Sequence, residues 1–296
     1  MSIYLRLLRP ADWIKNLFVF AALAFGDGIR DAHKDLLALL AFAAFCLTSS
    51  AGYILNDFLD RERDRQHPRK KDRPIASGAI TPQTAAVIFV VLLLAAAAIS
   101  FYLPVGFRLT LLGYLVLTIA YSLIFKYRVI LDVLVIAVLF VLRALAGAQA
   151  IDVPVSSWLM VCTFMLCLFL GFGKRRCEIA MIGDTTAIRR HRPTLVRYTP
   201  DLLTHLLSTS GGIAIITFLL YTLDTTTHSP FMAHKQHLVY TLPLVVYGIF
   251  RYAMLIELGE TTGPTDLVVR DRPFLITIVL WVLMTIGILY LGPQVF

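Results

Sequence analysis

A short stretch near residue 60 carries three carboxylates at helical spacing. It runs Asn-Asp-Phe-Leu-Asp-Arg-Glu-Arg-Asp from Asn56 to Asp64 and begins where an apolar segment ends. Residues three and four apart share a helix face, so Asp57, Asp60 and Asp64 should cluster. Clustered carboxylates repel each other unless a cation lies among them, and oxygen ligands of this kind suit Mg²⁺. The stretch predicts a magnesium site, and a solvated helix end with interleaved ion pairs is the alternative interpretation.

Basic residues follow the acidic stretch. Lys70, Lys71 and Arg73 come within ten residues of Asp64. Metal-bound pyrophosphate needs cationic partners, and Arg can contact phosphate oxygens through two parallel hydrogen bonds. His67 is a further candidate for substrate binding, although a lone histidine at a loop entry is more often a local hydrogen-bonding group. Charge that only fixes membrane topology is the competing explanation for each of these cations.

The composition places these residues in a membrane protein. Hydrophobic residues make up 58% of the 296, charged residues only 16%, and the mean hydropathy is +0.76. A helix needs about 20 apolar residues to cross a bilayer. Nine stretches qualify, near 13–28, 36–57, 83–103, 107–125, 129–150, 156–173, 202–223, 237–258 and 274–292. The expected fold is therefore all-α, a polytopic bundle of nine transmembrane helices forming a single integral-membrane catalytic domain over residues 1–296.

The distribution of charge predicts the orientation of the chain. Two long basic loops, 59–82 and 174–201, follow the second and sixth expected spans. With nine spans these loops fall on one side, together with shorter basic loops at 126–128 and 259–273. By the positive-inside rule the N-terminus lies in the cytoplasm, the C-terminus lies outside, and both long loops face the cytoplasm at the inner membrane. Because topology explains the net charge of +8, that charge gives little reason to expect a nucleic-acid partner.

Polar residues inside expected spans are candidates for function. Arg143 lies well within the fifth span, where an isolated arginine costs at least about 2.5–3.5 kcal/mol and normally faces a cavity or a partner. Asp132 lies nearer the cytoplasmic end of the same span. A structural ion pair is the alternative role for Arg143. Tyr198 is either a ligand or an interfacial aromatic residue.

The stretch Asn56–Asp64 is the NDxxDxxxD signature of the UbiA-type intramembrane prenyltransferase superfamily, which the chain resembles over most of its length. The wider sequence, from Asn56 to Gly78, resembles the branch of decaprenyl-phosphate phosphoribosyltransferases. Further segments are similar to that branch: Arg9–Asn16, Tyr121–Lys126 with Asp132 and Arg143 beyond it, Gly173–Glu178, Phe250–Tyr252 and Arg270–Pro273.

One departure from the superfamily separates two possible substrates. Aromatic prenyltransferases of the superfamily usually carry a second motif, DxxxD, after the sixth span. Here that position reads Lys-Arg-Arg-Cys-Glu from Lys174 to Glu178, with Asp184 further on. Cations largely replace the second acidic cluster, which fits a substrate with additional phosphates better than a second metal site.

The resemblance thus implies transfer of 5-phosphoribose from phosphoribosyl pyrophosphate to a polyprenyl phosphate, with Mg²⁺ as cofactor. It implies Asp57, Asp60 and Asp64 as the catalytic, metal-binding residues. The candidate substrate-binding residues are Lys15, Asn16, Asn56, His67, Lys70, Arg73, Lys126, Asp132, Arg143, Lys174, Arg175, Glu178 and Tyr198.

Two other functions stay open at this stage. A prenyltransferase could use the first motif to move a prenyl group from its diphosphate onto an aromatic or other small acceptor, although the missing second motif argues against it. A transporter would also have many spans, but its acidic residues are expected near the bilayer midplane rather than at a helix end. The sequence leaves the lipid chain length and the oligomeric state open, a homo-oligomer included.

Overall fold

The computed structural model describes residues 3–25, 31–66, 70–182, 195, 197–224, 230–259 and 270–291. In these residues every regular element is a helix. Eight helices of the described ranges are long and apolar enough to cross a membrane, so the chain is an integral membrane protein. The chain forms two compact units. Unit 1 comprises residues 1–128 and 139–154, and unit 2 comprises residues 129–138 and 155–296, so that one helix belongs partly to each.

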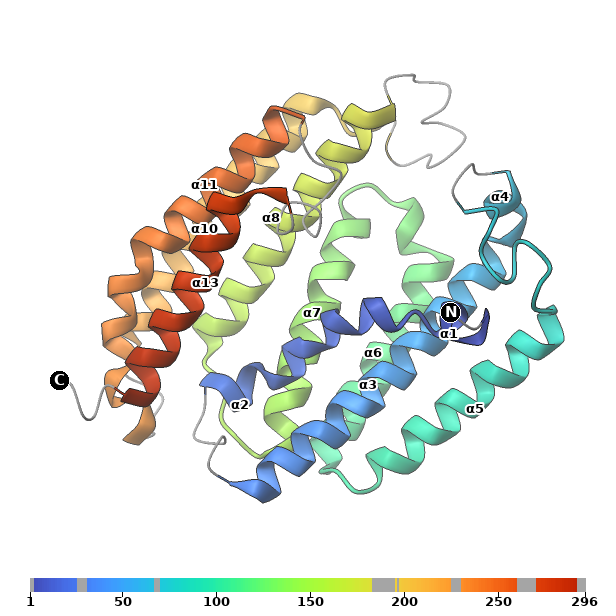
Figure 1. Cartoon of the computed structure of the whole chain (residues 1–296), viewed down its shortest axis with the longest axis horizontal. Coiled ribbons are helices and arrows are strands. Elements are labelled where there is room, and N and C mark those ends of the chain that lie inside the picture. Colours follow the sequence, from blue (N-terminus) through green and yellow to red (C-terminus); the bar gives the residue numbers. More distant parts are fainter. Residues whose placement is uncertain are drawn as a thin grey trace. The chain divides into compact units, whose positions relative to one another are not determined.

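Unit 1 is built around one long helix. Its elements are α1 (Ile3–Leu8), the 3₁₀ helix η1 (Pro10–Phe20), α2 (Ala21–Phe25), α3 (Ala32–Leu59), α4 (Arg61–Arg65), α5 (Pro82–Ser100), α6 (Val105–Leu123), the 3₁₀ turn η2 (Phe125–Tyr127) and the C-terminal part of α7 (Leu131–Ala150). Helix α3 packs against α5, α6, η1 and α1 (Figure 1). Its buried face is rich in alanine, which lets neighbouring helices approach closely.

Among the described residues, unit 2 contains the N-terminal part of α7 and six further elements. These are α8 (Ser157–Ile182), α10 (Pro200–Leu223), the 3₁₀ helix η4 (Pro230–Thr241) leading into α11 (Leu242–Glu257), α13 (Arg272–Ile286) and the short π-helix η5 (Gly287–Leu291). Helices α8 and α10 form the most extensive contact of this unit.

Polar caps followed by proline start three of the long helices. Thr81 accepts a hydrogen bond from the Thr84 amide before α5, and Thr199 does the same for the Leu202 amide before α10. Asp271 accepts from the Phe274 amide before α13. The caps satisfy amides that no helical carbonyl can reach, and proline is well suited to the first turn.

The structure bears out eight of the nine expected spans and does not confirm the ninth. The segment predicted at 13–28 contains the 3₁₀ helix η1 and the five-residue α2, and neither qualifies as a span. Helix α8 continues to Ile182, beyond the end predicted at 173. The membrane orientation of the termini stays a prediction.

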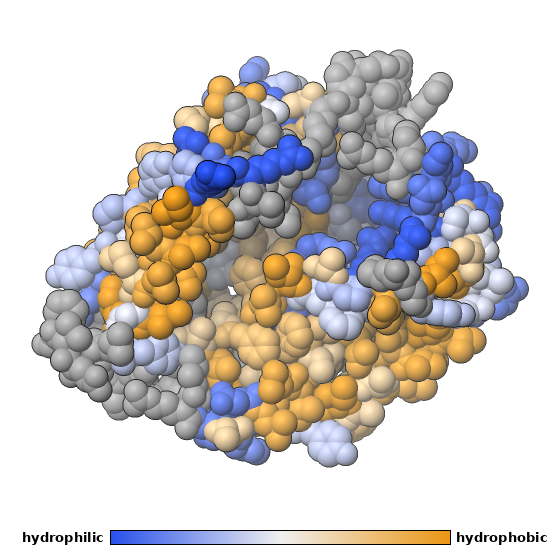
Figure 2. Space-filling model, viewed as in Figure 1, coloured by the Kyte–Doolittle hydropathy of each residue, from blue (hydrophilic) through white to orange (hydrophobic). Residues whose placement is uncertain are grey.

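Hydrophilic and hydrophobic side chains are segregated on unit 1. Figure 2 shows hydrophilic residues gathered around α4, whereas hydrophobic residues cover the flank of α5. Many of these α5 side chains are exposed, among them Val87, Val90, Val91 and Leu94. Exposed aliphatic side chains along a span are expected of a surface that faces lipid.

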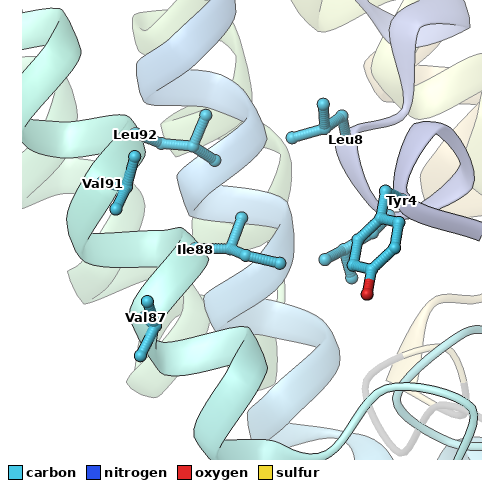
Figure 3. Close-up of a pocket in the computed structure, with 7 residues that line it drawn as sticks. Tyr4, Leu8, Val87, Ile88, Val91 and Leu92 are labelled. Atoms are coloured by element: carbon cyan, nitrogen blue, oxygen red, sulfur yellow. The ribbon is translucent and has the colours of Figure 1, made fainter.

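A wholly apolar cavity of about 280 Å³ lies between α1 and α5. It is lined by Tyr4, Leu7, Leu8, Val87, Ile88, Val91 and Leu92. Figure 3 shows the α5 side chains on one side of the cavity and Tyr4 and Leu8 on the other. Leu8 directly precedes Arg9, so the chain that forms one wall continues into the polar region described next.

Candidate active site

The aspartates of the first motif lie where α3 ends and α4 begins. Asp57 is on the last turn of α3, Asp60 joins the two helices, and Asp64 is in α4. Asp57 and Asp64 are only 2% and 3% exposed. Such buried carboxylates need charged partners, because burial of an unpaired charge is very costly. Of the alternative, a solvated helix end with interleaved ion pairs, solvation is wrong for these two residues, whereas both do form ion pairs.

Two arginines from distant segments provide partners. Arg9 Nη2 lies 2.6 and 2.7 Å from the two carboxylate oxygens of Asp57. Arg73 Nη1 donates to Asp57 Oδ1 at 3.0 Å and to Asp64 Oδ2 at 2.7 Å. Two carboxylates thus converge on one nitrogen of Arg73.

The third carboxylate has a different cation. Lys126 Nζ lies 2.8 Å from Asp60 Oδ1 and 3.2 Å from Asn56 Oδ1. Lys126 is 9% exposed, and it comes from the short η2 turn after α6. Asn56, Asp60, Arg73 and Lys126, all predicted as site residues, are therefore brought together in unit 1.

The donor set fits a hard divalent cation in part. Asp57 and Asp64 already direct oxygens at a single positive centre, as carboxylate ligands of Mg²⁺ must. Within the part of the chain that the structure describes, no three acidic, His or Cys side chains lie close enough together to form a metal site. Asp60 turns to Lys126 instead, so a centre formed by all three carboxylates stays a prediction.

Arg9 is a site residue that the sequence did not single out. Its backbone adopts a left-handed conformation, with φ 52°, at the start of η1. That conformation is uncommon outside glycine and is often found where a functional constraint holds it. Arg9 also lies over the ring of Tyr53, 5.1 Å from its centroid. The only signal in the sequence was its place in the segment Arg9–Asn16 that resembles the family.

A second polar group lies inside unit 1 around Arg143, which is 5% exposed. Arg143 donates from Nε to Asn16 Oδ1 at 2.9 Å, from Nη1 to the Leu139 carbonyl at 3.0 Å and from Nη2 to Tyr114 Oη at 2.8 Å. Every one of these acceptors is neutral. The alternative role of Arg143 in an ion pair is therefore not what the described residues show, and Tyr114 is a partner that the sequence did not reveal.

Asn16 and Lys15 connect this group to α3. Asn16 is buried and donates to Ser49 Oγ at 3.0 Å. Lys15 Nζ lies 2.5 Å from Asp12 and 3.4 Å from the hydroxyl of Tyr53, the residue under Arg9. Asn16 thus belongs to the polar interior of unit 1, whereas the Lys15 side chain is 41% exposed.

The remaining predicted residues of unit 1 are Lys70 and His67. The backbone carbonyl of Lys70 accepts a hydrogen bond from the Arg73 amide at 3.0 Å, which closes the turn that carries Arg73. His67 lies outside the described residues.

Unit 2 contains a separate buried group at the start of α7. Asp132 is fully buried and accepts a 2.7 Å hydrogen bond from the hydroxyl of Tyr198. The same hydroxyl accepts from the Ile130 amide at 2.6 Å. Arg175 Nε lies 3.0 Å from Asp132 Oδ2, and Arg175 Nη1 donates to Glu178 at 2.6 Å.

This arrangement determines the protonation of Tyr198. Burial, together with the hydrogen bond to Asp132 and the charge on that residue, raises the pKa of Tyr198. Its hydroxyl therefore keeps its proton at neutral pH and donates it to the carboxylate. Ile130 has φ 69°, a strained conformation for a β-branched residue, and its amide donates the hydrogen bond to Tyr198.

The cationic segment that replaces the second motif is divided by burial. Lys174 is exposed, whereas Arg175 is 3% exposed and lies between two carboxylates. Arg175 therefore orients Asp132 and Glu178 in this structure, and its predicted contact with a phosphate stays a prediction. Lys174 has the more accessible side chain for such a contact.

Comparisons with known proteins agree with the sequence resemblance. The chain is 31% identical to a decaprenyl-phosphate phosphoribosyltransferase of Mycolicibacterium smegmatis, over 94% of this chain and 89% of the relative. It is 30% identical to the enzyme of that name from Corynebacterium glutamicum, over 98% and 87%. A solved UbiA homologue of Archaeoglobus fulgidus, bound to GPP and Mg²⁺, has a TM-score of 0.72 at 22% identity and covers 97% of this chain and 99% of its own.

The comparison with family models gives the same result over most of the chain. The model described as the UbiA prenyltransferase family matches residues 16–268, which include the acidic motif, Lys126, Arg143 and the α8 cations. With a family match of that extent and relatives of this identity over nearly the whole chain, the protein is a transferase enzyme and belongs to the UbiA prenyltransferase family.

Proposed function

We propose that the protein transfers 5-phosphoribose from phosphoribosyl pyrophosphate to a polyprenyl phosphate and releases pyrophosphate. The observation that carries the proposal is the extent of the likeness to the decaprenyl-phosphate phosphoribosyltransferases, which spans 94–98% of this chain. The likeness to a protoheme IX farnesyltransferase of Paramagnetospirillum magneticum spans only 56%.

The chemistry needs little from a general base. A phosphate oxygen of the acceptor forms a bond to the anomeric carbon of the donor while the bond from that carbon to pyrophosphate breaks. The acceptor oxygen is already anionic, so no proton has to be removed. The barrier lies in the charge that develops on the leaving pyrophosphate, and fixed positive groups are the means of lowering it.

Residues of unit 1 are suited to that role. Arg73 and Lys126 present positive groups beside the motif, and Arg9 adds a third. Mg²⁺, when bound by Asp57 and Asp64 and by Asp60 if it turns away from Lys126, would neutralise charge on the pyrophosphate. Each arginine can bind phosphate oxygens with its planar guanidinium.

The apolar cavity between α1 and α5 suits the lipid acceptor. All seven of its lining residues are apolar or aromatic, and the wall formed by Leu7 and Leu8 leads directly to Arg9. Since Arg9 contacts Asp57, the cavity begins close to the carboxylates. We assign the first part of the polyprenyl chain to this cavity, with the rest in the surrounding lipid.

Further roles follow for the other predicted residues. In unit 2, exposed Lys174 is the candidate for contact with a substrate phosphate. The enzyme would reside in the inner membrane with its basic loops facing the cytoplasm. Phosphoribosyl pyrophosphate, which is water-soluble, would reach the site from that side.

The experiment that tests this proposal uses the purified full-length chain in detergent. It is incubated with ribose-labelled phosphoribosyl pyrophosphate, polyprenyl phosphate and Mg²⁺, and the lipid is extracted. We expect label in the lipid phase, and we expect chelation of the metal to abolish it. A folded protein that yields no labelled lipid would contradict the proposal.

A prenyltransferase acting on an aromatic acceptor is the second candidate. The shared first motif favours it, as does a 43% identity to a 4-hydroxybenzoate octaprenyltransferase of Xanthomonas oryzae, but that likeness covers only 25% of this chain. Transfer of label from a prenyl diphosphate to 4-hydroxybenzoate, with none from phosphoribosyl pyrophosphate, would favour this candidate.

A further inference from the structure

Each carboxylate of the acidic motif has a cation of the protein in contact. The pairs are Arg9–Asp57 at 2.6 Å, Arg73–Asp57 at 3.0 Å, Arg73–Asp64 at 2.7 Å and Lys126–Asp60 at 2.8 Å. Three carboxylates therefore face three cations, and the formal charge of the cluster is zero. Repulsion among the carboxylates, the reason for expecting a bound metal from the sequence, is already relieved.

Burial makes these ion pairs strong competitors for a metal. The side chains of Asp57 and Asp64 are 3% and 5% exposed, and Arg73 is 24% exposed. Charges in such surroundings are screened much less than in water, so a carboxylate that loses its cation must gain an equivalent partner. A divalent cation that binds Asp57 Oδ1 and Asp64 Oδ2 has to compete with Arg73 for these two oxygens.

A free metal ion also meets repulsion once it is bound. It would add two positive charges next to the guanidiniums of Arg9 and Arg73, and to the ammonium of Lys126 if it also engaged Asp60. A diphosphate removes both difficulties, because its negative charge balances the metal and its oxygens accept hydrogen bonds from the displaced arginines.

We propose that Arg9, Arg73 and Lys126 make metal binding depend on the diphosphate, so that the site takes up the two together and binds either one weakly. Arg73 is the main competitor of the metal, because one of its nitrogens contacts two carboxylates. The inference rests on the proposed function only in assigning a diphosphate to this site. Binding of the metal and of the diphosphate are reciprocally coupled, as linkage requires.

The test measures binding by the full-length protein in detergent, with no turnover. Mn²⁺ binding is followed by electron paramagnetic resonance in the absence of other ligands. Binding of radiolabelled inorganic pyrophosphate is measured by equilibrium dialysis in EDTA and in Mg²⁺. For the wild type we expect pyrophosphate to bind at least about tenfold more tightly in Mg²⁺ than in EDTA, within the usual range of coupling between sites.

Substitution of Arg73 should raise the affinity for the metal alone and lower the affinity for pyrophosphate. Arg73→Ala should bind Mn²⁺ alone about tenfold more tightly than the wild type and should bind pyrophosphate in Mg²⁺ more weakly. Arg63→Ala is the matched control, because Arg63 is a nearby exposed arginine whose hydrogen bond goes to the Tyr127 hydroxyl. It should leave both affinities unchanged within twofold.

Two results would overturn the inference. One is wild-type pyrophosphate binding that is equally tight in EDTA and in Mg²⁺, which needs no variant to be folded. The other is Mn²⁺ binding by Arg73→Ala that is no tighter than that of the wild type. A protein that shows the coupling but transfers no phosphoribose would refute the proposed function and leave this inference standing.

Discussion

Asp60 is the motif residue whose contacts fit its predicted role least directly. Its partner is Lys126, and it does not share the Arg73 nitrogen on which Asp57 and Asp64 converge. If Asp60 is nonetheless a ligand of the metal–diphosphate complex, it must leave Lys126 when the substrate binds. That exchange would free Lys126 for the pyrophosphate.

Asp60→Asn should keep the fold and reduce kcat by about 100-fold or more, because Asp60 would help to hold the metal that neutralises charge on the leaving pyrophosphate, and loss of such stabilisation has an effect of this size. Glu62→Gln is the matched control, since Glu62 lies two residues away and, among the described residues, pairs with Arg61 and Arg65 at the surface. Steady-state turnover at saturating Mg²⁺ measures both variants. Wild-type turnover by a folded Asp60→Asn protein would remove Asp60 from the site.

Tyr198 has a structural role that can be separated from substrate binding. Tyr198→Phe removes one hydroxyl and leaves the Ile130 amide and an Asp132 oxygen without that partner. We expect a loss of about 1–3 kcal/mol of stability, the usual cost of an unsatisfied buried polar group. Thermal unfolding in detergent measures it.

Tyr127→Phe is the comparison for this variant. The Tyr127 hydroxyl accepts a hydrogen bond from Arg63, and the residue is 41% exposed. Its loss should change stability by less than about 0.5 kcal/mol. Equal effects of the two substitutions would show that the buried contact of Tyr198 contributes nothing specific.

The residues of the site were only partly predictable from the sequence. Asp57 and Asp64 both contact Arg73, but they lie on two helices, α3 and α4, so helical spacing alone does not account for their proximity. Arg9 is 48 residues from Asp57, and Tyr114 is 29 from Arg143. Such contacts depend on how helices pack, which no local pattern encodes.

At the scale of the elements, the crossing of η1 and α7 within unit 1 depends on one glycine. A Cβ added at Gly147 would lie 1.8 Å from the Val19 carbonyl oxygen, so the two backbones are in direct contact. Small residues permit such close approach between helices in membranes. The crossing also brings Asn16 of η1 to Arg143 of α7.

Gly147→Ala should therefore destabilise the protein by at least about 1–3 kcal/mol, the range for overpacking, because a backbone oxygen cannot move away as a side chain can. Gly113→Ala is the control, since nothing lies within 4 Å of a Cβ at that helical position. It should be neutral or slightly stabilising. Melting temperatures that fall equally for both variants would contradict the close crossing.

The apolar cavity offers a second test at this scale. Val91 and Val90 are neighbours on α5 with similar exposure, 56% and 51%, but only Val91 lines the cavity. Val91→Trp should raise KM for polyprenyl phosphate about tenfold or more while KM for phosphoribosyl pyrophosphate stays within twofold. Val90→Trp should change neither constant. If both variants behave alike, the acceptor chain does not occupy this cavity.

Hydropathy predicted most of the membrane-spanning helices. It failed for the segment at 13–28, and it placed the end of α8 too early. The segment after Pro10 is largely apolar, yet its buried polar residue Asn16 contacts Ser49 and Arg143 inside unit 1. An apolar stretch packed against protein looks the same in the sequence as one packed against lipid. Helix α8 extends past 173 because hydropathy marks where a membrane ends, whereas a helix can continue through charged residues.

At the scale of the whole molecule, the family and the enzyme class follow from features spread along the chain. The acidic motif is typical of the superfamily, and the cations from Lys174 onwards, which take the place of a second acidic motif, support the proposed phosphoribosyltransferase activity. Both segments lie within the residues matched by the family. What separates the two activities is which bond breaks: the bond from ribose to pyrophosphate, or the bond from a prenyl carbon to its diphosphate.

A double-label transfer experiment tests that distinction most directly. The purified chain is given phosphoribosyl pyrophosphate labelled with ¹⁴C in the ribose and polyprenyl phosphate labelled with ³³P, in the presence of Mg²⁺. The account predicts a single lipid product that carries both labels, because the acceptor keeps its phosphate and gains the ribose. The account would be contradicted by a lipid that contains no ¹⁴C, together with a parallel reaction in which the same protein transfers prenyl groups from an added prenyl diphosphate to an added aromatic acid.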